Sequence, residues 1–160
     1  MGDPVDPSDF SKQTVADAAG LTIDDAKNAG DENKAMQIMA KGSSLLALQL
    51  YQKRKFDGVI ILGGTMGTDL ALDVCMALPL GVPKYVVSTV SFSPLIPADR
   101  LAPDIQMILW AGGLYGLNSI CEASLAQAAG AVLGAAKATI IRKEKIPCVG
   151  ITSLGTSALK

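Results

Sequence analysis

The sequence contains no histidine. Histidine is the commonest metal ligand in proteins and the usual base beside a serine or cysteine nucleophile. Its absence leaves the chain without the ordinary catalytic triad, and we expect no metal site.

Cysteine is scarce as well, with only Cys75, Cys121 and Cys148. They form no C-x-x-C pair, and an odd number is a poor basis for a disulfide framework. Each lies in an apolar stretch, so we expect buried free thiols in a reducing compartment and predict a cytoplasmic protein.

Neither the net charge nor the apolar segments of the chain indicate that it binds nucleic acid or a membrane. The net charge is -1, and the one basic cluster, Lys53-Arg54-Lys55, is short and suits the C-terminal end of a helix. The small-apolar run at 128–136 is shorter than the roughly 20 residues needed to span a bilayer. Residues 1–10 lack the features of a signal peptide. We therefore expect no nucleic-acid or membrane partner.

What the sequence does contain is typical of a folded domain. The 160 residues are 49% hydrophobic and 18% charged, which suits one domain with a sizeable core. Residues 1–9 are polar and contain prolines, and we expect a flexible lead-in there. The α/β domain is predicted at 10–152. A tail, or the start of a truncated second domain, follows at 153–160.

Helical patterns fill the first third of the chain. Residues 11–20 and 21–30 each predict a short helix ended by glycine. Residues 31–54 predict a long amphipathic helix with apolar side chains in steps of three and four. Gly42 lies inside that helix and costs roughly 1 kcal/mol relative to alanine, so a close neighbour is expected beside it.

Strand and helix patterns alternate from residue 59 onward. The run VIIL at 59–62 is continuously apolar, which fits a strand covered on both faces. Such alternation predicts an open parallel sheet of about four strands with flanking helices, a Rossmann-like α/β fold. The predicted strands are 59–62, 84–90, 105–109 and 146–152, and the predicted helices are 68–78 and 118–143, the latter opening with a capping box from Ser119 to Glu122.

The turn Gly63-Gly64-Thr65-Met66-Gly67-Thr68 joins the first strand to its helix. Ligands of open parallel sheets lie outside the carboxyl ends of the strands. Glycines let a ligand approach the backbone, and the bare amides of a helix N-terminus attract anions. The hydroxyls of Thr65 and Thr68 add donors. We predict a phosphate or carboxylate site, with a purely structural glycine turn as the alternative.

The turn matches no named catalytic motif. No lysine follows Gly67 as a P-loop requires, and the adjacent Gly63 and Gly64 break the dinucleotide fingerprint. Gly63-x-Thr65-x-Gly67 has the spacing of a nucleophile elbow, but the chain has no histidine to activate the threonine. No reaction is assigned.

Other polar side chains follow the predicted strands or open a helix. Each suits a turn or a cap by itself. A parallel sheet brings them to one edge, however, where they can share a ligand. They are Ser88, Thr89, Ser91, Asn118, Ser153 and Thr156.

Three segments together resemble a known family. They are FDGVIILGGTMGTDLALDVCMALPLGVPKYVVSTV, GLN followed by a small-residue helix, and AGDENKAMQIMAKG. Over residues 12–156 the chain is similar to the N-terminal half of the Tm-one-like ATP-binding family, a mostly bacterial family named for the tomato mosaic virus resistance protein. Its hallmark is a strand, G-G-[ST]-x-G-T, a helix, L-P-x-G-x-P-K and V-S-T.

The resemblance implies a Rossmann-like domain that binds ATP or another small phosphate-bearing ligand. It also implies a second α/β domain, which ITSLGTSALK would open. The site residues that it implies are Gly63, Gly64, Thr65, Gly67 and Thr68, with Lys84, Ser88 and Thr89 nearby.

Two functions are open at this point. The first is a phosphate- or nucleotide-binding domain of unknown reaction, half of a two-domain protein. The second is a non-catalytic interaction or oligomerisation module, in which Gly130-x-x-x-Gly134 packs tightly on the sheet or on a twin helix. We expect a homo-oligomer, or pairing with a missing C-terminal domain.

Overall fold

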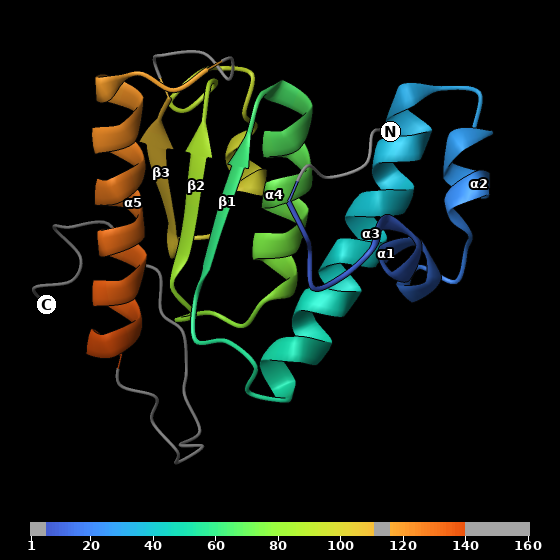
Figure 1. Ribbon diagram of the computed structural model, residues 1–160, viewed down its shortest axis with the longest axis horizontal. Coiled ribbons are helices and arrows are strands. Elements are labelled where there is room, and N and C mark those ends of the chain that lie inside the picture. Colours follow the sequence, from blue (N-terminus) through green and yellow to red (C-terminus); the bar gives the residue numbers. More distant parts are fainter. Residues whose placement is uncertain (1–5, 111–115, 140–160) are drawn as a thin grey trace, which may run out of the picture.

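A computed structural model of the chain describes residues 6–110 and 116–139. Figure 1 shows the parallel sheet between α4 (Thr65–Ala77) and α5 (Ser119–Ala138), with the N-terminal helices beyond α4. The predicted α/β class and parallel sheet are confirmed. The predicted strand at 146–152 and the tail at 153–160 lie outside the described residues.

The three N-terminal helices pack together, and the third of them also packs extensively on α4. They are α1 (Lys12–Ala18), α2 (Ile23–Lys27) and α3 (Glu32–Gln52), and both α1 and α2 pack on α3. Each begins where a side-chain oxygen accepts a backbone N–H of the first turn, which is the usual way to satisfy such a donor. The capping residues are Ser11, Thr22 and Asp31.

Gly42 has the close neighbour that its position predicts. A Cβ atom there would lie 1.9 Å from the carbonyl oxygen of Val15 in α1. No side chain fits at that distance, so the glycine allows α1 to cross directly over α3.

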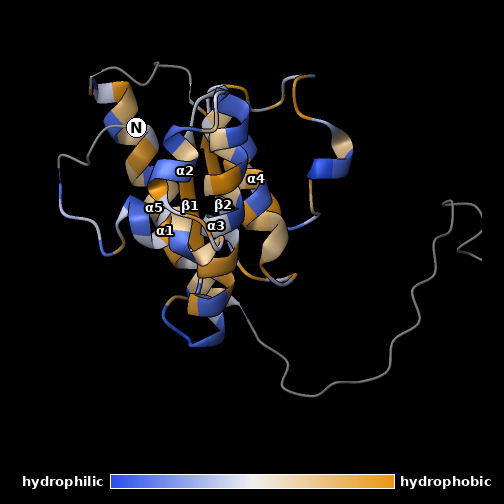
Figure 2. Ribbon diagram, turned by 90° about the vertical axis from the view of Figure 1, so that its right-hand side faces the viewer, coloured by the Kyte–Doolittle hydropathy of each residue, from blue (hydrophilic) through white to orange (hydrophobic). Residues whose placement is uncertain are grey.

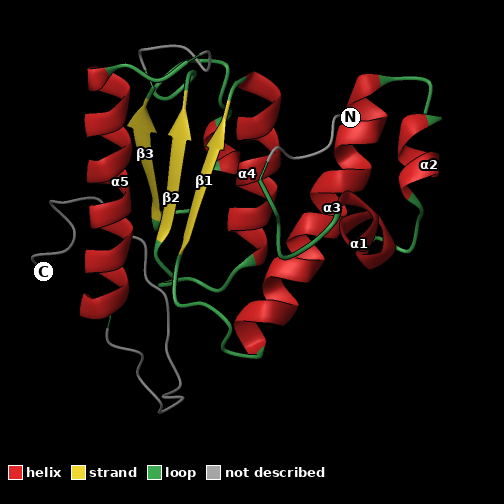
Figure 3. Cartoon of the chain, in the orientation of Figure 1, coloured by secondary structure: helices red, strands yellow, loops and turns green. Residues whose placement is uncertain are grey.

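The sheet has the order β1-β2-β3, and all its pairings are parallel. The strands are β1 (Val59–Gly63), β2 (Lys84–Ser88) and β3 (Ile105–Leu109), drawn as arrows in Figure 3. Their last residues, Gly63, Ser88 and Leu109, lie in register. The carboxyl ends of the three strands therefore form one edge. The second strand is shorter than the predicted 84–90.

Side chains alternate between the two faces of the sheet, and one helix covers each face. On one side α4 (Thr65–Ala77) packs Ala71 and Cys75 against Val86. On the other side α5 (Ser119–Ala138) packs Cys121 and Ala128 against Val87. Figure 2, coloured by hydropathy, shows that the helices carry both apolar and polar residues.

Both described cysteines, Cys75 and Cys121, are buried and free, as predicted. Burial raises the pKa of the Cys75 thiol to about 11. The thiol is therefore protonated at neutral pH, and it is not the activated thiolate that nucleophilic or redox chemistry requires.

Two helix starts differ from the predictions. The helix after β1 begins at Thr65 instead of residue 68, with Gly64 in the extended conformation that is usual for an N-cap residue. The last helix is capped by Asn118, whose carboxamide oxygen accepts the N–H groups of Ile120 and Cys121. The predicted capping box starting at Ser119 is therefore wrong by one residue.

We predict that Gly42→Ala lowers the free energy of unfolding by about 1–3 kcal/mol, although alanine is the better helix former. The added methyl group forces α1 away from α3 and loosens the packing of the N-terminal helices. Urea unfolding followed by circular dichroism measures the change. Gln49→Ala, at an exposed position of the same helix, is the control and should change stability by less than about 0.5 kcal/mol.

Candidate functional site

The turn between β1 and α4 is shaped by a steric requirement at Gly63. A Cβ atom there would lie 2.5 Å from the carbonyl carbon of Gly67 and 2.8 Å from the amide nitrogen of Thr68. The first turn of α4 therefore packs directly on the end of β1. Gly67 has no comparable requirement, since its nearest neighbour would be the Leu62 oxygen at 3.8 Å.

A chain of hydroxyl groups links this helix to the neighbouring strand. Thr68 Oγ1 donates to the Gly64 carbonyl oxygen at 2.7 Å and lies 2.5 Å from Ser88 Oγ. Because the Thr68 hydroxyl donates its single proton to the Gly64 carbonyl oxygen, the Ser88 hydroxyl is the donor in the bond between Ser88 and Thr68. Ser88 Oγ also accepts the Val90 N–H at 3.0 Å. Both hydroxyls are buried and occupied, so they position the turn and do not face a ligand.

The N-terminus of α4 is left without a side-chain cap. Its N-cap residue is Gly64, which has no side chain to accept a hydrogen bond. The other α-helices of the described chain are capped by serine, threonine, aspartate or asparagine. The first N–H groups of a helix have no partner within it. Thr65 and Met66 are exposed at this point, so these donors are open to solvent or to a ligand.

The remaining predicted site residues behave differently from one another. Thr89 is half-buried beside the turn, and its N–H donates to the Gly63 oxygen at 3.3 Å. Ser91 is buried, and its hydroxyl is shared between the carbonyl oxygens of Ser88 and Ile108. Asn118 lies in the cap of α5. Ser153 and Thr156 are outside the described residues.

Lys84 is not brought to the turn. It is the first residue of β2 and pairs in register with Val59, at the opposite end of the sheet from Gly63. Its side chain is 1% exposed, and its ammonium lies 2.8 Å from Asp104 Oδ2. Burial tends to raise the pKa of Asp104. Hydrogen bonds from Lys84 and from the Gly81 amide, together with the lysine charge, nevertheless hold that pKa below its ordinary value.

A second ion-pair cluster, which sequence reasoning missed, fixes the proline-containing loop on α4. The loop carries the short helix η1 (Ala98–Arg100). The Arg100 guanidinium bonds Asp69 Oδ1 at 2.7 Å and Asp73 Oδ1 at 2.9 Å, and it reaches the Asp69 carbonyl oxygen at 3.0 Å. Within residues 6–110 and 116–139, no three histidine, cysteine or acidic side chains gather as they would around a metal ion.

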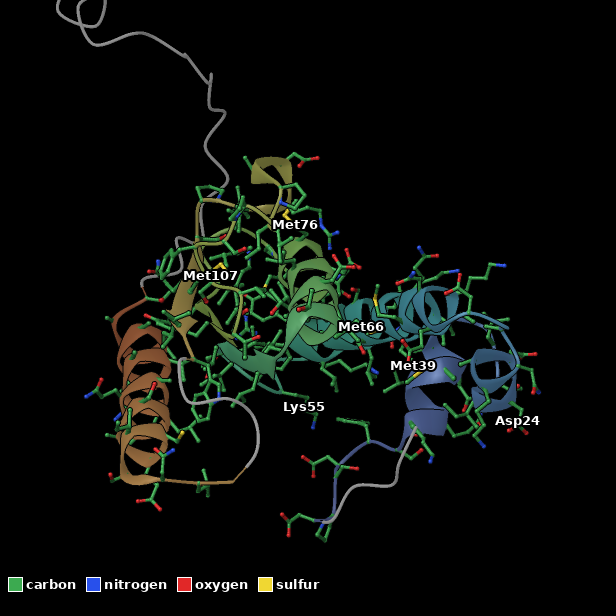
Figure 4. All side chains as sticks on the ribbon, turned by 90° about the horizontal axis from the view of Figure 1, so that it is seen from above. Asp24, Met39, Lys55, Met66, Met76 and Met107 are labelled. Carbon is green, nitrogen blue, oxygen red and sulfur yellow. The ribbon has the colours of Figure 1, made fainter. Side chains whose placement is uncertain are left out.

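A groove of about 780 Å³ adjoins the first turn of α4. Met36 and Met39 of α3 line it opposite Met66 of α4, and Figure 4 labels Met39 and Met66. Its charged lining residues are Lys27, Asp31 and Glu32. The sequence did not reveal this groove, because methionines at helical spacing indicate ordinary packing.

The comparisons with known proteins point to one group. A family model described as the N-terminal domain of an uncharacterised protein family, UPF0261, matches residues 1–140. Over all 160 residues the chain is 52% identical to a UPF0261 protein of Brucella suis and 51% identical to one of Brucella melitensis. It spans 38% of the length of each of these relatives.

A more distant match is to the ToMV resistance protein Tm-1 of Solanum lycopersicum. It is 29% identical over 100 residues, which are 62% of this chain and 13% of the tomato protein. The resemblance to the Tm-one-like family is thus found in part, since the nearer relatives are uncharacterised bacterial proteins.

We predict that Asp104→Asn lowers the free energy of unfolding at neutral pH by about 3 kcal/mol, because it leaves the buried Lys84 charge unpaired. The pKa of Asp104 is lower in the folded than in the unfolded protein. Its contribution is therefore complete above the unfolded pKa of about 3.9 and is lost as the pH falls through the folded pKa.

Urea unfolding across the acidic range tests both statements. The Asn variant should lose less stability on acidification than the unsubstituted protein. Asp57→Asn, at an exposed position, is the control and should keep the original pH profile. A variant at 104 with unchanged stability would show that the ion pair contributes nothing.

Proposed function

The chain belongs to the uncharacterised UPF0261 family, as its N-terminal domain, and we propose that this domain binds a small phosphate-bearing ligand at the N-terminus of α4. A nucleotide such as ATP is the leading candidate for that ligand. No reaction is assigned, since the described residues around the turn include no free base or activated nucleophile.

One observation carries the proposal, namely the uncapped start of α4 at the carboxyl edge of a parallel sheet. A helix N-terminus bears a partial positive charge, and its free N–H groups bind phosphate or carboxylate oxygens. At an N-cap, serine, threonine, asparagine or aspartate is worth about 1 kcal/mol relative to alanine, but only a few tenths relative to glycine. Gly64 therefore costs the helix little and keeps the peptide groups accessible.

The groove beside the turn supports a ligand with two unlike parts. Its volume of about 780 Å³ lies within the usual range for small-molecule sites. The methionine side chains suit an apolar or planar group. Of the charged residues that line the groove, Asp31 and Glu32 repel a phosphate and can accept hydrogen bonds from hydroxyl or amino groups. The Lys27 ammonium, by contrast, is paired with Asp24. The phosphate therefore belongs at α4, and the uncharged part of the ligand belongs in the groove.

The donors of this site are peptide groups, supplemented by the exposed Thr65 hydroxyl. Thr68, Ser88 and Ser91 serve as its framework, because their hydroxyls are used inside the protein. Lys84 takes no part, since it is buried at the other end of β2. We infer that the bound anion is neutralised mainly by the helix end, since the Lys27 ammonium in the groove lining is paired with Asp24 at 3.1 Å.

The relatives are longer than this chain, so the whole protein's activity is a separate question. We propose that the carboxyl edge faces a second domain of the longer protein, which would supply further ligand contacts. The alternative function, an interaction or oligomerisation module, is favoured by the exposed apolar surface of α5, and it does not exclude ligand binding at α4.

We predict that Gly64→Asp abolishes binding of phosphate and nucleotides, because the carboxylate caps the helix and occupies the anion position. In the absence of ligand, the melting temperature of the variant should be at least as high as that of the original protein. Thermal unfolding with and without inorganic phosphate or ATP measures both effects. A ligand present at 100 times its Kd stabilises the original protein by about 2.7 kcal/mol.

Gly64→Ala is the matched control for this experiment. It adds the same Cβ atom without a carboxylate, so it should keep most of the ligand-induced stabilisation. If the original protein shows no stabilisation by phosphate, nucleotides or phosphosugars, the binding proposal is wrong and the glycine turn is structural.

A further inference from the structure

The two faces of α5 differ in character. The inner face carries Cys121, Leu125 and Ala128 in steps of four and three, and it packs on the sheet around Val87. The opposite face is exposed along its whole length. The outer face of α5 is defined here as Glu122, Ala123, Ala126, Gly130, Leu133, Gly134 and Lys137.

Two glycines of the outer face have no explanation within the described part of the chain. A Cβ atom at Gly130 or Gly134 would meet nothing within 4 Å. Each glycine nevertheless costs the helix roughly 1 kcal/mol relative to alanine. Gly42 shows the contrast, because its space is taken by α1. Small residues inside a helix allow another backbone to approach closely, which points to a neighbour from outside.

The charges and the sizes of the side chains on the outer face of α5 are complementary to those of a second α5 that runs antiparallel to it. Glu122 and Lys137 lie at nearly equal distances on either side of Gly130, and so do Ala126 and Leu133. In an antiparallel pair with its two-fold axis beside Gly130, Glu122 lies opposite Lys137 of the second copy at both ends. Leu133, which is 60% exposed, then covers Ala126 of the second copy.

We propose that α5 is the interface of a homodimer in which a second copy of this chain packs its own α5 antiparallel across the outer face. The interface is isologous, so each favourable contact occurs twice. A parallel pair is disfavoured because it would place like charges against each other at Glu122 and at Lys137. This interface is separate from the proposed ligand site at α4.

Membrane insertion is the main competing explanation of this surface. By length and composition alone, α5 is able to cross a membrane. However, α5 packs on the sheet through Cys121, Leu125 and Ala128, and a helix held in this way is not free to span a bilayer. The antiparallel dimer, by contrast, pairs the exposed charges of Glu122 and Lys137.

Sedimentation of the full 160-residue chain over a range of concentrations tests the dimer. We predict a reversible dimer that Gly130→Leu weakens on the order of 30-fold or more. The leucine holds the two helices apart, yet it has room in the monomer and favours the helix. The melting temperature of the monomeric variant should therefore be no lower than that of the original monomer. Gln49→Leu on α3 adds the same side chain elsewhere, and it should leave the dimer intact.

Charge exchange tests the antiparallel arrangement. Glu122→Lys and Lys137→Glu should each weaken the dimer about tenfold, because each replaces two attractive pairs by repulsive ones. The double variant restores opposite charges and should recover most of the affinity. A parallel or unrelated interface would show no such recovery.

Three results would overturn the proposal. The first is a chain that is monomeric at every concentration. The second is a dimer that responds to neither Gly130→Leu nor the charge exchange. The third is a monomer that binds phosphatidylcholine vesicles through α5, which would assign the surface to lipid.

Discussion

The close approach of α4 to the end of β1 determines the geometry of the carboxyl edge. Because Gly63 has no side chain, the backbone of Gly67 packs directly on it. Thr68 then comes within reach of Ser88 in the neighbouring strand. The Ser88 carbonyl oxygen accepts the N–H of Trp110, just after β3, at 2.9 Å. The missing side chain at Gly63 thus lets α4 contact two strands, and the backbone bond from Trp110 joins the third.

The elements of the fold could largely be predicted because their signals are local. Apolar runs mark the three strands, and Gly20 and Gly30 mark the ends of the first two helices. The start of α4 was misplaced because Gly64 provides no capping signal. The Lys84–Asp104 pair was missed because the two residues are 20 positions apart, with β2 and the proline-containing loop between them. Only the parallel register places Lys84 far from the glycine turn.

The location of the candidate site could be predicted from the sequence, but the contacts within it could not. The glycine turn and the convergence of Gly63, Ser88 and Thr89 follow from parallel topology. The parallel topology does not predict which hydroxyls are free, because Thr68 and Ser91 find their partners only in the folded chain. The groove was also invisible, since it arises where the N-terminal helices meet α4, a contact between segments that carry no shared motif.

The buried hydroxyl groups at the carboxyl edge are hydrogen-bonded within the protein, so peptide N–H groups are the main donors left for an anion. This affects how binding of the anion depends on pH. Peptide N–H groups neither gain nor lose a proton over the range in which side chains titrate. An anion held by the start of α4 would therefore sense pH mainly through its own ionisation. For a phosphate monoester that transition lies near pH 6, so the protein's recognition surface would remain chemically constant while the charge state of its ligand changed.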